Sequence, residues 1–146
     1  ITHEMDVVKQ ICDKVAVIDK GVLVEQGMVG EIFANPKTAL AKAFIRSTFH
    51  VNLPDEFTQK LSSTPTSSPV IKFEFTGNSV DKPLFSKASK EFGVEFNILT
   101  SQMDYVGGVK FGFTIAQIIG NPNDIKLAQD FLTEHQVGLE VIGYVA

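Results

Sequence analysis

The sequence has 146 residues, of which 44% are apolar and 21% are charged. These proportions are typical of a folded globular protein and exclude an intrinsically disordered chain. The 17 acidic residues outnumber the 13 basic ones, and the net charge of −4 argues against nucleic acid as the main partner. No apolar run approaches the roughly 20 residues that a membrane-spanning helix needs. The lone Cys12 excludes an internal disulfide and fits a reducing compartment.

The first fifty residues are predicted to form a helix, a β-hairpin and two short helices. Apolar residues at helical or strand-like spacing predict these elements at residues 5–15, 15–24, 28–34 and 38–47. Both hairpin strands are almost entirely apolar, so we expect them to be buried on two faces. Fifty residues do not supply that cover, which predicts that this part needs neighbours outside the chain.

The middle of the chain is predicted to be a linker. Residues 62–69 contain only serine, threonine and proline, and they carry no apolar side chain that could join a core. Two prolines also disfavour a helix there. The sequence therefore predicts an incomplete first domain over residues 1–49, a linker over residues 50–69 and a second domain over residues 70–146.

The second domain alternates strands and helices in the order βαββαβ. Apolar spacing predicts strands at residues 70–76, 94–103, 109–118 and 139–144, and helices at residues 81–92 and 125–135. A turn over residues 104–108 joins the middle strands. Right-handed crossovers make this order an antiparallel sheet with both helices on one face. We therefore expect an α+β, ferredoxin-like fold.

Two helices on one face of such a sheet leave its other face free. We expect Val94, Phe96 and Ile98 on the covered face. The free face then takes the intervening residues of both middle strands, namely Glu95, Asn97, Leu99, Ser101, Met103, Gly112, Thr114, Ala116 and Ile118. Small and apolar side chains with one amide indicate an interface or a small-ligand site, and we expect dimerisation through this face or its edge. The alternative is that Leu99 and Ile118 pack under a loop or against the first domain.

The sequence contains no pattern typical of a catalytic or metal site. None of His3, His50 and His135 has an acidic or thiol partner at a useful spacing, and His135 fits the end of a helix. Cys12 lies on the apolar side of the first helix, and no Cys or His pair has metal-ligand spacing. Gly107-Gly108 lies between two strands, so it predicts a hairpin turn rather than a phosphate loop. The second domain alone is predicted to be a binding module, not an enzyme.

The first domain resembles the end of an ABC-transporter ATPase domain. The similarity lies in Ile1–Val8, Cys12–Gly21, Glu25-Gln26-Gly27, Glu31-Ile32-Phe33 and Asn35-Pro36. The resemblance implies an α/β ATPase that uses ATP and Mg, in which His3 is the switch histidine that contacts the γ-phosphate. The phosphate loop, the signature sequence and the Walker B acid of that family would precede Ile1. We therefore expect a piece of a larger protein that does not hydrolyse ATP by itself.

The second domain resembles the small ACT-like domain, often called NIL, of the ATPase subunit of bacterial methionine importers. The similarity lies in Phe73–Gly77, Asp81–Leu84, Asn97–Leu99, Gln102–Gly112 and Glu140–Val145. The resemblance implies that this domain binds L-methionine near the interface of two copies and inhibits import by feedback. Asn97 would hold the amino-acid head group, and the apolar residues Leu99, Met103 and Tyr105 would contact the thioether.

Together the two resemblances predict part of the ATP-hydrolysing subunit of a methionine importer. Such a subunit lies at the cytoplasmic face of the bacterial inner membrane, contacts a transmembrane permease subunit and forms a homodimer through the C-terminal domain. The alternative is a free-standing ACT-like amino-acid sensor or dimerisation module without ATPase activity. The sequence that precedes Ile1 distinguishes the two, because only an ATPase subunit carries a phosphate loop there.

Overall fold

The computed structural model describes residues 1–66 and 68–145, so Ser67 of the predicted linker and Ala146 lie outside the described residues. The chain divides into two compact units. The first unit holds Ile1–His50 together with Met103–Phe111. The second unit holds Val51–Gln102 and the chain from Gly112 onward. The predicted domain boundaries stay a prediction. The units divide after His50, and residues 103–111 of the predicted second domain group with the first unit.

The first unit contains the predicted helix, hairpin and two short helices. They are α1 (Met5–Ile11), β1 (Lys14–Asp19), β2 (Val22–Met28), α2 (Val29–Ala34) and α3 (Ala39–Ser47). The first helix ends earlier than expected, because Val15 pairs with Gly27 in the hairpin. Ile18, Val22 and Leu23 are each at least half exposed. These apolar side chains of the hairpin are therefore open to solvent, and the need for neighbours outside the chain stays a prediction.

Glu25 of β2 holds the start of α3. Its side chain is buried, and its carboxylate accepts hydrogen bonds from the backbone N–H of Lys37 (2.8 Å), the backbone N–H of Thr38 (3.0 Å) and the Thr38 hydroxyl (2.7 Å). The Thr38 hydroxyl in turn accepts from the Ala41 N–H and caps α3. Burial raises the pKa of the Glu25 carboxyl, but these hydrogen bonds and the Lys37 charge lower it overall below its usual value.

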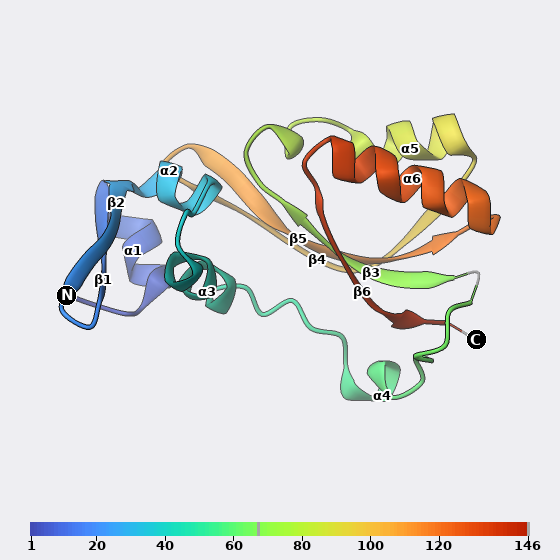
Figure 1. The fold of residues 1–146 in the computed structure, drawn as a ribbon, viewed down its shortest axis with the longest axis horizontal. Coiled ribbons are helices and arrows are strands. Elements are labelled where there is room, and N and C mark those ends of the chain that lie inside the picture. The colour runs from blue at the N-terminus through green and yellow to red at the C-terminus, as the bar shows by residue number, and fades with distance from the viewer. Residues whose placement is uncertain (67, 146) are drawn as a thin grey trace. The chain divides into compact units, whose positions relative to one another are not determined.

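The second unit has the predicted ferredoxin-like fold. Its elements are α4 (Asp55–Thr58), β3 (Pro69–Phe75), the 3-10 helix η1 (Gly77–Ser79), α5 (Leu84–Phe92), β4 (Glu95–Val106), β5 (Val109–Ile119), α6 (Pro122–Glu134) and β6 (Gly138–Tyr144). The strand order is β4-β5-β3-β6, and β3 pairs antiparallel with both β5 and β6. Both α5 and α6 lie on one face of this sheet (Figure 1). The α+β class and the βαββαβ order are confirmed.

The hydrophobic core of the second unit lies between the sheet and the two helices. It is formed by apolar residues that alternate along β3 and recur at helical spacing in α5 and α6. Its largest members include Ile71, Phe73, Leu84, Ile118 and Leu132, each at most 1% exposed. Burying a side chain of this size contributes about 1.5–3 kcal/mol. The sequence therefore supplies a complete core for this unit.

The predicted face assignment of β5 is wrong. Ala116 and Ile118 were expected on the free face, but both belong to the core beneath the helices. Register explains the difference, because Ala116 pairs with Ile71 and Thr114 with Phe73, and cross-strand partners share a face. Ile118 thus packs under helices and not under a loop or the first domain.

The residues that precede β3 run beside β6. Ser62 and Tyr144 exchange two backbone hydrogen bonds of 2.8 and 2.9 Å, and the Thr66 hydroxyl donates to the Val145 carbonyl oxygen. A hollow of about 410 Å³ separates residues 51–58 from the sheet face opposite the helices. Its sheet side is lined by Lys72, Ile115, Glu140 and Ile142. The segment predicted as a linker therefore covers part of the face that was expected to be free.

Candidate ligand strand and the hairpin tip

The four predicted ligand residues all lie on β4, which is an edge strand of the sheet. Asn97 is exposed and Leu99 is half-buried, while Met103 is 40% and Tyr105 65% exposed. A strand rises about 3.4 Å per residue, so Met103 lies about 20 Å from Asn97 along β4. Asn97 and Leu99 therefore lie two residues apart on β4, whereas Met103 and Tyr105 lie beyond the reach of a single amino acid bound at Asn97 of the same chain.

The alternation of side chains along β4 is interrupted. Phe96 stacks on Phe85 of α5 with ring centroids 4.5 Å apart, so its side chain lies on the helix face. The Ser101 hydroxyl lies 2.8 Å from the Thr114 hydroxyl, and Thr114 pairs with the core residue Phe73, so Ser101 also lies on the helix face. Strict alternation would put residues five positions apart on opposite faces. The phase of β4 therefore changes between Phe96 and Ser101.

This change of phase is the reason that the face assignment by sequence fails. Ile98, expected on the covered face, is 57% exposed, whereas Val94 and Phe96 pack against the core as expected. Irregular strand positions often lie next to binding sites, because they redirect a side chain without ending the strand. Asn97 and Leu99 lie within the irregular stretch.

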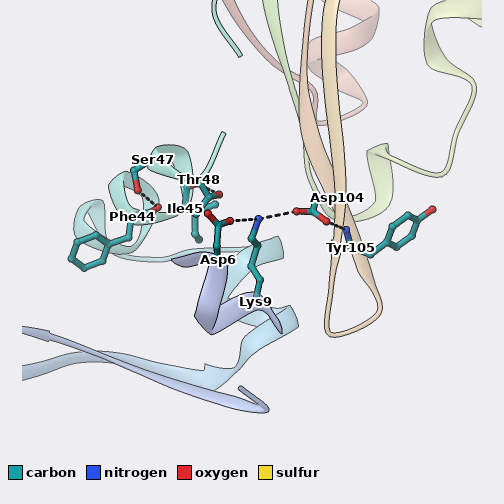
Figure 2. Close-up of polar contacts among 8 residues, drawn as sticks. All are labelled: Asp6, Lys9, Phe44, Ile45, Ser47, Thr48, Asp104 and Tyr105. Atoms are coloured by element: carbon teal, nitrogen blue, oxygen red, sulfur yellow. Dashed lines mark hydrogen bonds and ion pairs between the residues drawn. The ribbon is translucent and has the colours of Figure 1, made fainter. Parts of the chain in front are cut away.

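The tip of the β4–β5 hairpin, residues 103–111, belongs to the first unit. The Lys9 ammonium of α1 lies 2.9 Å from an Asp104 carboxylate oxygen at this tip and 2.9 Å from the Asp6 carboxylate one helical turn earlier (Figure 2). The second Asp104 oxygen accepts a hydrogen bond from the Tyr105 N–H at 2.9 Å. Lys9 is therefore held between a carboxylate of its own helix and one that is 95 residues away in the sequence.

The charges of this cluster reinforce one another. Burial lowers the pKa of the Lys9 ammonium, but its hydrogen bonds to Asp104 and Asp6 raise it overall above the usual value. Burial raises the pKa of the Asp104 carboxyl, but the Lys9 hydrogen bond lowers it overall below the usual value. Both groups are therefore charged at neutral pH and form an ion pair.

Aromatic rings hold the tip beneath the ion pair. The Phe111 ring lies 5.4 Å from that of Phe33 in α2 and 5.0 Å from that of Phe49 (centroid distances), and all three residues are at most 6% exposed. The Phe49–Phe111 pair is edge-on and the Phe33–Phe111 pair is tilted. Ring pairs at this spacing contribute about 0.5–1.5 kcal/mol beyond the area that they bury. The Lys9 ammonium also lies 5.9 Å from the centre of the Phe49 ring.

Two glycines allow the backbones of the tip and α2 to touch. A Cβ atom on Gly107 would lie 2.9 Å from the Gly30 backbone nitrogen, and one on Gly30 would lie 3.0 Å from the Val106 carbonyl oxygen. Gly107 and Gly108 have positive φ angles of 55° and 79°, as a two-residue hairpin turn requires. The predicted five-residue turn is thus shorter, and the strands extend to the glycines.

His3, the predicted switch histidine, is exposed and precedes α1 by two residues. Among the described residues, no three His, Cys, Asp or Glu side chains are grouped so that they could hold a metal ion. None of the helices in the described ranges is long and apolar enough to cross a membrane.

Residues 69–141 match the model of the NIL domain family. The chain belongs to the NIL domain family. It is 66% identical over 148 aligned residues to the methionine import ATP-binding protein MetN of Haemophilus influenzae and 62% identical to that of Pasteurella multocida. Each alignment covers 99% of this chain and 43% of the relative, so the chain spans less than half the length of these proteins.

One solved structure that resembles the chain is the C-terminal domain of an ABC transporter ATP-binding protein from Enterococcus faecalis. The identity is 25%, the TM-score is 0.48, and the alignment covers 51% of this chain and 83% of that one.

The NIL domain match includes both the ligand strand and the hairpin tip. The tip therefore belongs to the NIL domain by sequence, although its residues contact α1, α2 and Phe49 in the first unit. Neither Lys9 nor Asp104 carries a signal in the sequence that marks it as a site residue. Their opposite charges are the only signal, and 95 intervening residues make that signal indistinguishable from those of other acidic and basic residues.

Proposed function

We propose that this chain is part of the ATP-binding subunit of a bacterial methionine importer, and that its NIL domain binds cytoplasmic methionine and restrains import. The observation that carries the proposal is the 66% identity to the Haemophilus influenzae methionine import protein over almost the whole chain. The chain spans only 43% of that relative. ATP hydrolysis, the permease partner and the location at the cytoplasmic membrane face are therefore proposed for the complete subunit.

Asn97 and Leu99 have the chemistry that a methionine site needs. The Asn97 amide can donate to the carboxylate and accept from the ammonium of an amino acid. It is exposed on an edge strand, where a ligand can reach it. Leu99, two residues further on and half-buried, offers an apolar surface to the thioether.

A second copy would bring the backbone of Met103 to the strand that carries Asn97. An edge strand carries unpaired backbone groups that can pair with another strand. If two β4 strands pair antiparallel about a two-fold axis at Thr100, Met103 of the second copy lies opposite Asn97. Tyr105 of the second copy then follows two positions further along the strand. The proposed homodimer thus adds a second chain at the edge where Asn97 lies.

His3 is the residue of this chain that we propose to face ATP. Its imidazole is exposed just before α1, so a phosphate oxygen can approach and accept a hydrogen bond from it. In the complete subunit, hydrolysis of ATP bound with Mg would supply the energy for import. Among the described residues, no three His, Cys, Asp or Glu side chains are grouped so that they could hold the Mg ion.

Calorimetry with L-methionine on the whole chain tests the sensor. We expect saturable heat with the wild type and with Asn123→Ala, a control at an exposed asparagine of α6, and a large loss of affinity with Asn97→Ala. Norleucine, which replaces the sulfur by a methylene group, should bind more weakly. No heat at millimolar methionine would contradict the sensor, and equal binding by Asn97→Ala would contradict the assigned role of Asn97.

The importer is tested separately with the complete subunit. Vesicles that carry it with its permease should take up methionine only when ATP is supplied, and internal methionine should slow uptake. Methionine binding by the chain without any ATP-dependent uptake by the complete subunit would favour the free-standing sensor.

A further inference from the structure

A row of three side chains crosses the sheet of the second unit on the face away from its helices. Lys72 of β3 pairs with Ile115 of β5 on one side and with Glu140 of β6 on the other. Cross-strand partners share a face, and Lys72 lies between the core residues Ile71 and Phe73 along β3. Because those two core residues face α5 and α6, the row faces the opposite way.

The hollow of about 410 Å³ described above lies between this row and residues 51–58, and all of its lining residues belong to the second unit. Figure 1 shows residues 51–66 on the side of the sheet away from α5 and α6. The floor of the hollow is apolar at Ile115, which is 1% exposed, and at the half-buried Ile142. Pockets for small molecules have volumes of about 300–1,000 Å³, so an amino acid fits into this one.

The two charged side chains of the row have opposite signs, but they do not pair with each other. The Lys72 ammonium lies 4.8 Å from the centre of the Phe113 ring on β5. Glu140 lies on β6, and β3 separates that strand from β5. Among the described residues, neither Lys72 nor Glu140 belongs to an ion pair. The attraction between the ammonium and the ring therefore holds the positive charge away from the negative one.

A second negative charge comes from the segment that lies over the sheet. Asp55 of α4 is one of the residues that line the hollow. Asp55 and Glu140 are exposed and Lys72 is half-buried, so a ligand can reach all three charges from the solvent. The hollow therefore presents one positive and two negative groups around an apolar floor.

We propose that this hollow binds a small zwitterion with an apolar body, namely an α-amino acid with an aliphatic side chain. The carboxylate of the ligand pairs with Lys72, and its ammonium pairs with Glu140 and Asp55. Its side chain lies on Ile115 and Ile142, which removes apolar surface from water.

The charges of the hollow select a zwitterion over simpler ligands. A carboxylate without an ammonium gains Lys72 but meets two negative groups, and an amine without a carboxylate meets the positive one. An uncharged apolar molecule covers charged groups without pairing them, which is costly. In an α-amino acid both charges are carried by substituents of one carbon. The ligand can therefore bridge an ammonium and a carboxylate that are too far apart to pair directly.

This site is separate from the ligand strand on which the proposed function depends. Asn97 lies on β4 at one edge of the sheet, and Glu140 lies on β6 at the other edge. The row of Lys72, Ile115 and Glu140 contains no residue of β4. The inference therefore goes beyond the proposed function and can be tested independently of it.

A nuclear magnetic resonance titration of the whole chain with L-norleucine tests the site. The chain carries Asn97→Ala throughout, so that the proposed methionine site does not contribute. We expect the backbone amides of Lys72, Ile115 and Glu140 to shift saturably at millimolar ligand. L-Norvaline, which is one methylene shorter, should bind about three- to fourfold more weakly. Hexanoate lacks the ammonium and pentylamine lacks the carboxylate, and each should bind about tenfold more weakly than L-norleucine.

Variants test the partners that we assign to the ligand. Lys72→Gln and Glu140→Gln should each weaken L-norleucine binding about tenfold. The control is Lys126→Gln at an exposed lysine of α6, which should leave the affinity unchanged. Lys72→Arg keeps the positive charge and should keep the binding, so it separates the loss of the charge from a loss of the fold.

The outcomes separate this site from the sensor. Shifts that grow without saturation overturn the site, and so do saturable shifts confined to β4. Hexanoate or pentylamine that binds as tightly as L-norleucine overturns the zwitterion, and unchanged affinity in both Lys72→Gln and Glu140→Gln overturns the assigned partners. Because Asn97 is replaced in every sample, none of these results decides whether methionine binds at Asn97.

Discussion

Replacing Gly107 by alanine should loosen the hairpin tip from α2 more than the same change at Gly108 does. Both glycines have positive φ angles, so an alanine at either position costs about 1–2 kcal/mol of backbone strain. A Cβ atom on Gly108 meets nothing within 4 Å, whereas one on Gly107 meets the backbone of Gly30 at 2.9–3.0 Å. Backbone cannot move aside as a flexible side chain can, and such overpacking costs about 1–3 kcal/mol more.

Hydrogen exchange of the α2 amides measures this difference, because α2 carries Gly30. We expect exchange in Gly107→Ala to be about 5- to 150-fold faster than in Gly108→Ala, as the extra cost predicts. The amides of α6 serve as an internal reference in the second unit. Equal effects of the two variants on α2 would refute the close backbone contact, since strain alone acts in both.

The remaining predictions concern the stability of each unit. The first unit should lose stability in acid, because the pKa of Glu25 is lower in the folded state than in the unfolded chain. The stabilisation is complete above the unfolded pKa near 4.5 and is lost as the pH falls through the folded pKa. In thermal melts from pH 7 to 3, the melting temperature of Glu25→Gln should therefore fall less steeply than that of the wild type. The substitution itself should cost about 1–2 kcal/mol of stability at pH 7. In the second unit, Gly143→Ala should cost about 1–3 kcal/mol, because its Cβ atom would lie 2.8 Å from that of Leu61. A double-mutant cycle with Leu61→Gly should show coupling, and additive effects would indicate that residues 61–62 do not lie against β6.

The ferredoxin-like fold could be predicted because its signals are local. Ile71, Phe73 and Phe75 alternate along β3, and Leu84 and Ala88 recur at helical spacing, so each element carries its own pattern. The order of the elements and the right-handed crossover rule then leave one arrangement of the sheet. The structure has that arrangement.

The faces of the middle strands could not be predicted in the same way. A pattern of period two gives two faces but does not say where the period is interrupted. Phe96 and Ser101 lie on the same face only because β4 changes phase between them, and no residue type marks that position. Pairing with β3 decides the face of Thr114 and Ala116, and pairing is a property of the folded sheet.

In the candidate site, too, some residues could be predicted from local sequence and others could not. Asn97 and Leu99 could be selected from the sequence, because an amide and an apolar side chain on one strand have a recognisable chemistry. Lys9 and Asp104 could not, because the 95 residues between them carry no periodicity that relates one to the other. Their contact exists only because residues 103–111 fold with α1 in the first unit.

The sequence by itself was enough to predict that the chain folds, that the second domain has the βαββαβ order, and that the first part contains an apolar hairpin. Each of these follows from residues that are close together in the chain. The tertiary structure alone decided which residues share a face, that residues 103–111 fold with the first unit, and that Lys9 meets Asp104. The physical reason is that burial, register and ion pairing join residues by distance in space, and chain separation places almost no limit on which residues those are.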